Sequence, residues 1–581
     1  MNNEDLLARI GQSREETEFY TPMPPNYRLG RHKYVVVVGT VMSGLGKGIF
    51  SSSLARLLQD KGLRVAPIKM EGYYNIDSGT LNPYRHGEVF VLDDGMETDM
   101  DLGTYERLLD QDLGGANFIT NGQIMSSVLK KEREGSYLGR DVQAIPHVTG
   151  EIKLRLRELA AGSNADVVFV EVGGTVGDYE NSHYLEACRQ LAYEEGENST
   201  VFVALTYILE PSALGEQKSK AAQLGIKRLM EVGIMPNIIA CRAKHPVNDK
   251  VRQKISMYTN VPLRRVFSMH DVDSIYLIPD LLHTAGMDRE VLTLLDLHDR
   301  VDQGLEDKNR EQWRWFTDRI GKHRKEVRIA VTGKYTALRD AYASIIKAGE
   351  HCGVHLGVSV HFEWLDTTAI DAANVDRVLE GMHGIIVPGG FGVRGTEGKI
   401  ECIRYARENK VPYLGLCLGF QMAVIEYARN VCGLRGANST EFDPRCPEPV
   451  IDILPEQKKI EGLGGNMRLG GKDIQIKPNT VAAQLFANQP RIRLRFRHRY
   501  EVDPKYIPVL EQNGLVFSGK HPTQPIMQIL ELPRSVHPFF MGTQAHPELT
   551  SRPLRPQPMF MGLIDAAAAY AKITKHEIQA V

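Results

Sequence analysis

The stretch that decides the fold of the N-terminal half is "VVVVGTVMSGLGKGIF", Val35 to Phe50. Its four valines predict a buried parallel strand, and the glycines after them predict a tight turn into a helix. Such a turn presents backbone N–H groups at the start of the helix, where they and the helix dipole attract phosphate. The stretch therefore indicates a nucleotide site, although glycine in such a turn can also serve geometry alone.

This turn differs in two places from the common phosphate-binding spelling G-x-x-x-x-G-K-[ST]. Val41 stands at the first glycine, and Gly48 stands where a magnesium-binding hydroxyl is usual. Lys47 stands at the lysine position of the motif and supplies its positive charge. Any metal in this site must therefore be held by carboxylates from elsewhere in the chain.

Two other stretches offer such carboxylates. In "VVFVEVGGTVGD", Glu171 lies at the carboxyl end of an apolar strand, the end at which open parallel sheets bind ligands. A carboxylate buried there needs a cation, and magnesium on a phosphate would supply one. The stretch "DDGMETDMDLGTYE", taken alone, is typical of an acidic solvated loop. Its carboxylates are Asp93, Asp94, Glu97, Asp99 and Asp101.

Short apolar runs that alternate with amphipathic stretches predict an α/β protein with two domains. The first series of strands lies at 34–38, 166–172, 200–206 and 237–241, and the second at 327–333, 357–362, 383–390 and 412–419. Between them lies a charged helical segment. We expect an N-terminal extension at 1–32, a first domain at 33–287, a helical linker at 288–325 and a second domain at 326–581.

The composition of the chain narrows the class of protein. A chain of 581 residues with a formal net charge of -2 lacks the basic field that attracts nucleic acid or acidic membranes. No apolar run approaches the roughly 20 residues that cross a bilayer. The seven cysteines contain no C-x-x-C pair, which argues against a disulfide framework or a zinc site. We expect a cytoplasmic protein that binds small molecules.

A second candidate site lies in the C-terminal half. "LGLCLGFQ" places Cys417 between small residues in a nucleophile-elbow pattern, which favours a nucleophile over a buried apolar cysteine. "TQAHPEL" places His546 two residues before Glu548, so that a carboxylate can orient an imidazole. "VPGGFG" offers glycine N–H groups for an oxyanion. Together these motifs indicate acyl transfer.

The motifs of both halves resemble the CTP synthase family over nearly all of the chain after Lys33. The matching stretches are "SGLGKG", "NPYRHGEVFVLDDGMETDMDLGTYER", "KEREGSYLG", "VQAIPHVT", "VEVGGTVGD", "GEQKSK", "DVDSIY", "VPGGFGVRGTEGK", "PYLGLCLGFQ", "ANSTEF", "GGNMRLG", "RHRYEV" and "QAHPE". The resemblance implies a P-loop-type parallel-sheet synthetase domain followed by a class I glutaminase domain of flavodoxin-like α/β fold. It also implies ATP-dependent amination of UTP to CTP with ammonia from glutamine.

The resemblance assigns roles to residues of the synthetase half. The Mg2+ ligands would be Asp101 and Glu171. The ATP-binding residues would be Ser43, Gly44, Leu45, Gly46, Lys47, Gly48 and Lys69. The pyrimidine nucleotide would be held by Gln143, Asp178, Glu180, Lys218, Lys220, Gln223 and Lys254.

The resemblance also assigns roles to residues of the glutaminase half. The catalytic residues would be Cys417, His546 and Glu548, with Gly390 and Leu418 as backbone oxyanion donors. Glutamine would be held by Gln421, Glu441 and Arg499. Arg394, Gly395 and Glu397 match the family segment near its GTP effector, and 333–342 resembles its mobile lid. The resemblance further implies a homotetramer, a state from which filaments can form.

The chain departs from the sequence motifs of the family mainly in the synthetase half. In "GEQKSKAAQLGI", Ser219, Ala221, Ala222 and Leu224 stand where threonine, proline, threonine and histidine are usual. Each hydrogen bond lost near the nucleotide is worth about 0.5 to 1.5 kcal/mol. Three hypotheses follow: a UTP-using CTP synthase, a paralogue that aminates another oxo-pyrimidine or nucleotide-like acceptor, and a non-catalytic filament or regulatory relative. The intact triad with Lys47, Asp101 and Glu171 argues against the third, the clustering of the departures in the synthetase half is the feature that supports the second, and we expect the first.

Overall fold

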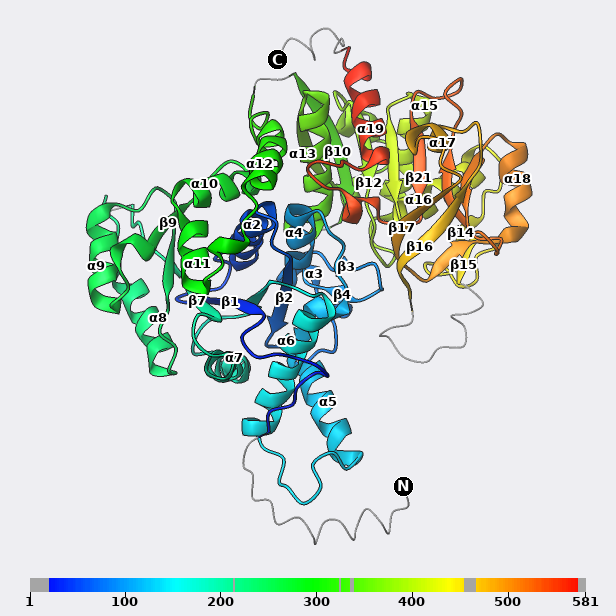
Figure 1. Cartoon of the computed structure of the whole chain (residues 1–581). Helices are drawn as coiled ribbons and strands as arrows, with labels where there is room; N and C mark the ends of the chain where they lie inside the picture. The colour runs from blue at the N-terminus through cyan, green and yellow to red at the C-terminus, as the bar shows by residue number, and fades with distance from the viewer. Residues whose placement is uncertain (1–19, 213–214, 323–324, 335–338, 454–466, 573–581) are drawn as a thin grey trace. The chain divides into compact units, whose positions relative to one another are not determined.

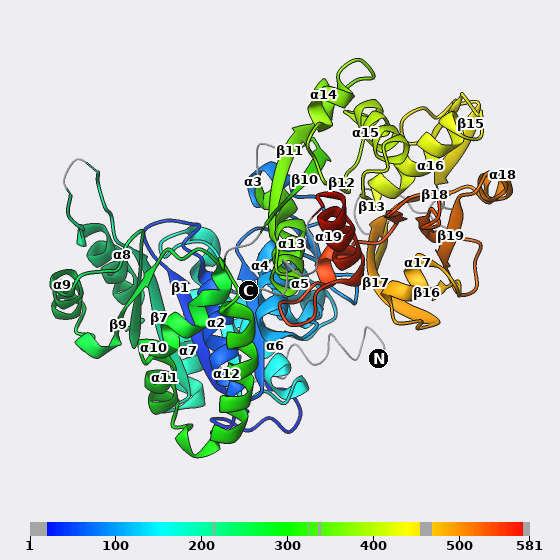
Figure 2. The same ribbon diagram turned by 90° about the horizontal axis from the view of Figure 1, so that it is seen from above.

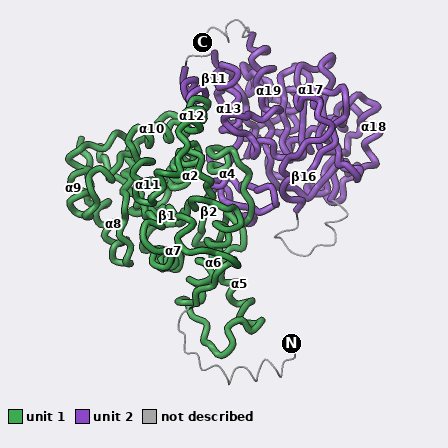
Figure 3. The backbone as a smooth tube through the Cα atoms, in the orientation of Figure 1, with its two compact units in different colours: residues 1–77, 104–313 green, residues 78–103, 314–581 purple. Residues whose placement is uncertain are grey.

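The computed structural model describes residues 20–212, 215–322, 325–334, 339–453 and 467–572. Their contacts form two compact units (Figure 3). The first unit holds the described residues up to 77 and from 104 to 313, and the second holds 78–103 and those from 314 onward. Segment 78–103 thus groups with the C-terminal residues, whereas the boundaries expected from the sequence are contiguous and stay a prediction.

A seven-stranded parallel sheet forms the core of the described part of the first unit (Figure 1). Each of its neighbouring pairs is parallel. In spatial order the strands are β5 (Phe118–Thr120), β2 (Val65–Glu71), β6 (Val167–Val172), β1 (Lys33–Gly39), β7 (Thr200–Tyr207), β8 (Ile238–Ala243) and β9 (Val266–His270). The α/β class and the strands expected from the first series of apolar runs are confirmed.

Helices cover both faces of this sheet because its strands carry apolar residues on both sides. Tyr34, Val36 and Val38 pack with the helices α6 (Thr149–Gly162), α7 (Ser182–Glu195) and α8 (Lys220–Glu231). The opposite face is covered by α2 (Lys47–Asp60), α10 (Ile278–Thr284) and α11 (Met287–Leu295). Two further helices of this unit are α5 (Asn121–Arg133) and α9 (Asp249–Thr259).

The expected helical linker contains α11 and α12 (Gln303–Thr317). Both are tied to the first unit by specific contacts, in α11 by the ion pair of Asp288 with Lys61 at 3.0 Å. Asn309 donates to the carbonyl of Asp60 at 3.1 Å, and the Trp313 indole donates to the carbonyl of Tyr276 at 3.1 Å. Most of this charged segment therefore belongs to a packed unit.

The expected N-terminal extension is described only from residue 20 onward. Tyr20 lies against Tyr137, with ring centroids 5.2 Å apart, and the hydroxyl groups of Tyr27 and Tyr34 are 2.7 Å apart. Residues 20–32 thus lie against the first unit. Residues 1–19 are outside the described range.

The second unit contains a mixed nine-stranded sheet (Figure 1 and Figure 2). Its parallel half is β11 (Ser359–Asp366), β10 (Glu326–Gly333), β12 (Gly384–Val387), β13 (Tyr413–Leu416) and β21 (Phe540–Thr543). Its antiparallel half continues through β20 (Met527–Glu531), β19 (Val516–Lys520), β16 (Arg468–Ile476) and β17 (Arg491–His498). The second series of apolar runs predicted the parallel strands up to β13 but none of the antiparallel ones.

Helices also lie on both faces of the parallel half of this sheet. Ala330, Ile385 and Val387 pack with α15 (Thr396–Glu408) and α16 (Leu418–Asn430). The opposite face is covered by α13 (Ala343–Leu356) and α19 (Pro558–Tyr570). A small sheet of β14 (Ala437–Ser439), β15 (Glu448–Ile453) and β18 (Tyr500–Val502) completes the unit. Among the described helices, none has the length and apolar run that crossing a bilayer requires.

A hairpin of β3 (Phe90–Val91) and β4 (Glu97–Thr98) belongs to the second unit and precedes α4 (Met100–Leu109). The sequence suggested an acidic solvated loop here, and this is wrong for Glu97, which is 2% exposed. Arg497 Nε donates to its carboxylate at 2.6 Å, and Arg493 pairs with Asp93 at 2.8 Å. The neutralising arginines lie on β17, so the acidic run by itself gives no sign of them.

Candidate functional site

Cys417 lies at a sharp turn between β13 and α16. Its φ of 50° and ψ of -97° fall in a region that residues with a side chain rarely adopt. A Cβ at Gly419 would lie 2.1 Å from the carbonyl oxygen of Val387, so this flanking position requires glycine. The strand, strained turn and helix are the geometry of a nucleophile elbow.

His546 and Glu548 follow β21 in the same unit. His546 Nδ1 and Glu548 Oε1 are 2.7 Å apart, and Glu548 is 4% exposed. Burial opposes protonation of the imidazole, but the Glu548 carboxylate and the neighbouring Cys417 outweigh it and raise the pKa of His546 well above its usual range. The carboxylate therefore stabilises the imidazolium that proton transfer from a thiol produces.

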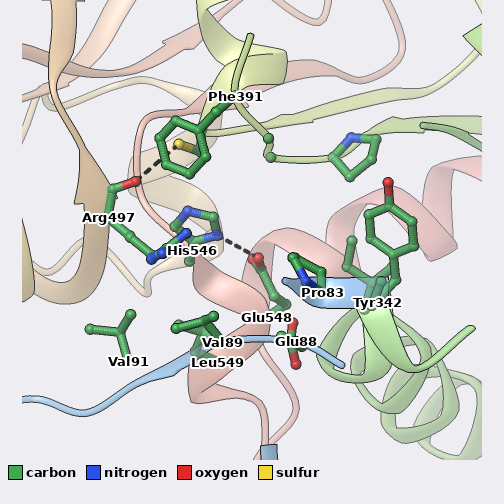
Figure 4. A pocket seen from close by; sticks show the side chains of 16 residues that line it. Pro83, Glu88, Val89, Val91, Tyr342, Phe391, Arg497, His546, Glu548 and Leu549 are labelled. Atoms are coloured by element: carbon green, nitrogen blue, oxygen red, sulfur yellow. Dashed lines mark hydrogen bonds and ion pairs between the residues drawn. The ribbon is translucent and has the colours of Figure 1, made fainter. Parts of the chain in front are cut away.

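A cavity of about 120 Å³ opens beside these residues (Figure 4). Its lining includes Cys417, His546, Gly390 and Phe391, and also Pro83, Glu88, Val89, Val91 and Tyr342. Gly389 makes a close approach here, since a Cβ on it would lie 2.9 Å from His546 Cε1. The glycine loop after β12 and the first turn of α16, which begins at Leu418, thus both lie next to the nucleophile.

A second pocket, of about 270 Å³, adjoins the first. Glu441 and Arg499, two of the residues assigned to glutamine by the resemblance, line it, and Glu441 Oε1 accepts from the backbone N–H of Gly392 at 2.7 Å. Burial raises the pKa of the Glu441 carboxyl group. Gln421 does not line this pocket: its amide donates to the Tyr500 carbonyl and to Gln544 Oε1, each at 3.1 Å.

The expected effector residues lie at the start of α15. Arg394 donates to the carbonyl of Lys334 at 3.0 Å, and Gly395, with φ 77°, precedes the first helical residue. Glu397 forms an ion pair with Arg429 at 2.9 Å, and its side chain is 71% exposed. Of the lid expected at 333–342, residues 335–338 are outside the described range.

Two residues near the nucleophile were not assigned a role from the sequence. Gln544 Nε2 donates to Cys417 Sγ at 3.5 Å, and its position two residues before His546 was the available signal. Lys399 on α15 is 1% exposed, and burial lowers its pKa to about 7, with Lys334 contributing. A Cβ on Gly390 would lie 4.0 Å from Lys399 Nζ, so this buried amine adjoins the glycine loop.

In the first unit, the stretch from Ser43 to Gly48, expected to bind phosphate, lies between β1 and α2 and enters the helix at Lys47. Val41, Gly44 and Gly46 have φ values of 74°, 73° and 78°. The N-terminus of α2 has no side-chain cap. Lys47 Nζ donates to the Gly174 carbonyl at 2.8 Å, and a Cβ on Gly39 would lie 3.1 Å from that nitrogen. The lysine is thus folded back over the carboxyl end of β1.

Lys69 and Glu171 meet on adjacent strands of the first unit. Lys69 Nζ donates to Glu171 Oε1 at 2.7 Å, and the Tyr105 hydroxyl donates to Glu171 Oε2 at 3.1 Å. Glu171 is fully buried. A buried carboxylate beside a phosphate loop is a hard oxygen ligand of the kind Mg2+ prefers. Asp101 belongs to the second unit, in the first turn of α4, where its N–H donates to Asp99 Oδ1 at 2.9 Å.

The residues expected around the pyrimidine nucleotide lie in segments that follow several different strands of the first sheet. Gln143 precedes the short helix Ala144–Val148, and Lys254 lies on α9. Asp178 and Glu180 follow β6, whereas Lys218, Lys220 and Gln223 follow β7. Because the carboxyl ends of parallel strands meet at one edge, the topology directs these segments to the same side of the sheet.

Within the residues that the structure describes, no hydrogen bond or ion pair joins these nucleotide residues to one another. Asp178 Oδ2 accepts from the Thr175 N–H at 2.7 Å, and Gln223 donates to Ser219 Oγ at 3.1 Å. In the described part of the chain, no ion pair joins Asp178 or Glu180 to a lysine. Two large apolar or aromatic residues of this region are exposed to solvent. The exposed fraction is 56% for Leu224 and 91% for Tyr179.

Comparison with known proteins matches both halves to family models. Residues 33–297 match the model described as CTP synthase N-terminus, and residues 337–566 match glutamine amidotransferase class-I. The chain is 48% identical over 536 residues to the CTP synthase of Thermococcus gammatolerans, covering 92% of this chain and 98% of that protein. It is 47% identical over 544 residues to the CTP synthase of Thermus thermophilus, covering 93% and 97%.

One solved structure adds a comparison for the second unit. It is the glutaminase domain of Trypanosoma brucei CTPS with bound acivicin, and it is 36% identical. The alignment covers 42% of this chain and 94% of that domain, with a TM-score of 0.39.

Proposed function

The chain belongs to the CTP synthase family, and from this membership we propose that it aminates UTP to CTP with ATP and with ammonia released from glutamine. The observation that carries the proposal is the second unit's strained Cys417 beside the His546–Glu548 pair. The ATP-dependent half is supported by Lys47, Lys69 and Glu171 at the carboxyl edge of the first sheet.

The glutaminase residues divide the chemistry among them. His546 takes the proton of Cys417, and Sγ attacks the side-chain amide carbon of glutamine. The N–H groups of Gly390 and Leu418 hold the oxyanion. His546 then gives its proton to the leaving nitrogen, ammonia departs, and water hydrolyses the thioester to glutamate. Glu548 keeps the imidazole oriented throughout.

Glutamine binding follows from charge complementarity. In the pocket of about 270 Å³, the Arg499 guanidinium suits the α-carboxylate and the Glu441 carboxylate suits the α-ammonium group. Gln421 acts from behind the pocket through Gln544, which touches Cys417.

In the synthetase half, Ser43 through Gly48 and Lys69 bind the ATP phosphates. Transfer of the γ-phosphoryl group to the uracil 4-oxygen converts that oxygen into a leaving group, which ammonia then displaces. Bound Mg2+ would neutralise phosphate charge, and Asp101 and Glu171 are the residues that would hold it. Lys69, which pairs with Glu171, would be released toward the phosphates.

The finer assignments rest on the family resemblance. UTP would be held by Gln143, Asp178, Glu180, Lys218, Lys220, Gln223 and Lys254. We also propose activation by GTP near Arg394, Gly395 and Glu397, a homotetrameric state, and a cytoplasmic location.

The test is direct measurement of the product. The purified chain with glutamine, ATP, Mg2+ and UTP should form CTP, identified by mass. Glutamine hydrolysis without CTP would contradict the choice of acceptor, and formation of the amino derivative of another oxo-pyrimidine nucleotide, supplied in place of UTP, would favour the paralogue.

A further inference from the structure

One wall of the glutamine pocket comes from an early part of the chain. Gly79 and Glu97 line this pocket together with Glu441 and Arg499. Glu97 lies on β4, and its side chain is only 3% exposed. A carboxylate buried at the edge of a ligand pocket is costly unless it is paired, so its partner decides what it does there.

That partner is Arg497 of β17. Arg497 Nε donates to Glu97 Oε1 at 2.6 Å, and Nη2 donates to the Gly79 carbonyl at 2.9 Å. The guanidinium also lies over the ring of Phe391, 5.2 Å from its centroid. A carboxylate, a carbonyl and an aromatic ring thus hold the guanidinium in one place.

The same arginine borders both cavities of the glutaminase half. It lines the cavity that holds Cys417 and His546 (Figure 4), and it also lines the glutamine pocket. Its own carbonyl oxygen lies 3.6 Å from Cys417 Sγ, which donates to it. The position of Arg497 therefore affects the substrate pocket and lies next to the nucleophile.

The surroundings of Glu97 leave its carboxylate little freedom. A Cβ at Gly79 would lie 2.2 Å from Glu97 Oε2, so a side chain at position 79 would displace it. The hairpin that carries Glu97 is fastened to β16, where the Gly471 N–H donates to the Asp93 carbonyl at 2.8 Å. The carboxylate is thus delivered to Arg497 by a fixed backbone.

We propose that Glu97 is a positioning residue for glutamine binding, because it holds the Arg497 guanidinium at the edge of the pocket and away from Glu441. The inference rests on the proposed function. Without Glu97, the guanidinium is attracted to Glu441, the carboxylate assigned to the α-ammonium group of glutamine, and competes with the substrate for it. The loss falls on glutamine affinity and not on the chemical step.

The test compares two acid-to-amide changes on one hairpin in the full-length protein. For Glu97→Gln we expect the KM for glutamine to rise about tenfold while kcat stays within about twofold. The rate of CTP formation from ammonia should be unchanged. The control is Asp93→Asn, whose pair with Arg493 has side chains that are 36% and 51% exposed. Such exposed pairs contribute little, so its kinetics should match the wild type.

A second variant tests the same contact from the other side. Gly79→Ala places a methyl group where the Glu97 carboxylate lies, and it should also raise the KM for glutamine; it decides the question if Glu97→Gln does not fold. An unchanged KM in both variants overturns the inference, as does a parallel fall of kcat with both nitrogen sources at constant KM. A wild-type chain that does not hydrolyse glutamine overturns the proposed function too, which separates the two failures.

Discussion

The charge on His546 depends on its immediate neighbours. Burial alone would keep the imidazole neutral, and it is the Glu548 carboxylate, 2.7 Å from Nδ1, together with Cys417 that raises its pKa. Because the raised pKa favours the protonated form, His546 can hold a proton taken from the thiol at neutral pH.

Replacement of Glu548 by glutamine should therefore lower the pKa of His546. We expect kcat/KM for glutamine hydrolysis to fall about 100-fold, since general acid–base catalysis contributes about 10²- to 10⁴-fold. The limb of the pH profile that belongs to His546 should move to lower pH. Steady-state rates between pH 5 and pH 9 would measure both effects, and a profile that keeps its position would contradict the role of Glu548.

Residues of the site differ in how far the sequence could reveal them. The elbow at Cys417 has a local signature, because Gly415 and Gly419 must flank a turn of that shape. Glu97 has none. Its burial depends on Arg497, which lies far along the chain, and neither an acidic run nor an arginine-rich strand specifies its partner.

At the level of elements, the contact between the β3–β4 hairpin and β16 depends on backbone approach. Gly470 has φ 78°, and a Cβ on it would lie 2.6 Å from the backbone nitrogen of Gly95. A side chain at position 470 would therefore push β16 and the β3–β4 hairpin apart. Most loop glycines with positive φ, by contrast, are glycine only because of their backbone conformation.

Gly470→Ala and Gly433→Ala separate these two reasons. Both positions have positive φ, but a Cβ at Gly433 meets nothing within 4 Å. The loop variant should lose about 1 kcal/mol of unfolding free energy from the backbone conformation alone. We expect Gly470→Ala to lose about 2 kcal/mol more, because packed backbone must move. Urea denaturation measures the difference, and equal losses would show that the close approach is unimportant.

Elements were predictable where burial is uniform. The valines of β1 and the apolar runs of β6 and β7 indicate strands covered on both faces, and the structure has them. β17 was missed because "RIRLRFRH" alternates arginine with apolar residues. That alternation is the signal of a half-exposed strand, but its charge makes it resemble a surface segment.

For the whole molecule, the proposed function separates the two chemistries between the two halves of the chain. Cys417→Ala should abolish glutamine use and leave amination by free ammonia, since ammonia needs no thiol. Lys47→Ala should abolish CTP formation from either nitrogen source, because the phosphate site serves both. CTP formation would be measured with glutamine and with ammonium chloride as the nitrogen source. Loss of ammonia-dependent CTP formation in Cys417→Ala, or CTP formation from either source in Lys47→Ala, would contradict this division.

The sequence predicted two α/β domains in the correct order, and it predicted them as contiguous pieces of chain. The grouping of 78–103 with the C-terminal residues could not be seen in this way. Periodicity reports which residues are buried, not which distant strand covers them, so a segment that crosses to another unit leaves no local mark.

That crossing segment limits how the gene for such a protein can be recombined. A chimaera joined near residue 326 would inherit Arg497 from one parent and Gly79 and Glu97 from the other. Its C-terminal glutaminase would be complete in sequence, but part of the lining of its glutamine pocket would come from the other parent. Residues 78–103 should therefore be exchanged together with the C-terminal domain. A substitution at Gly79 would first reduce the use of glutamine.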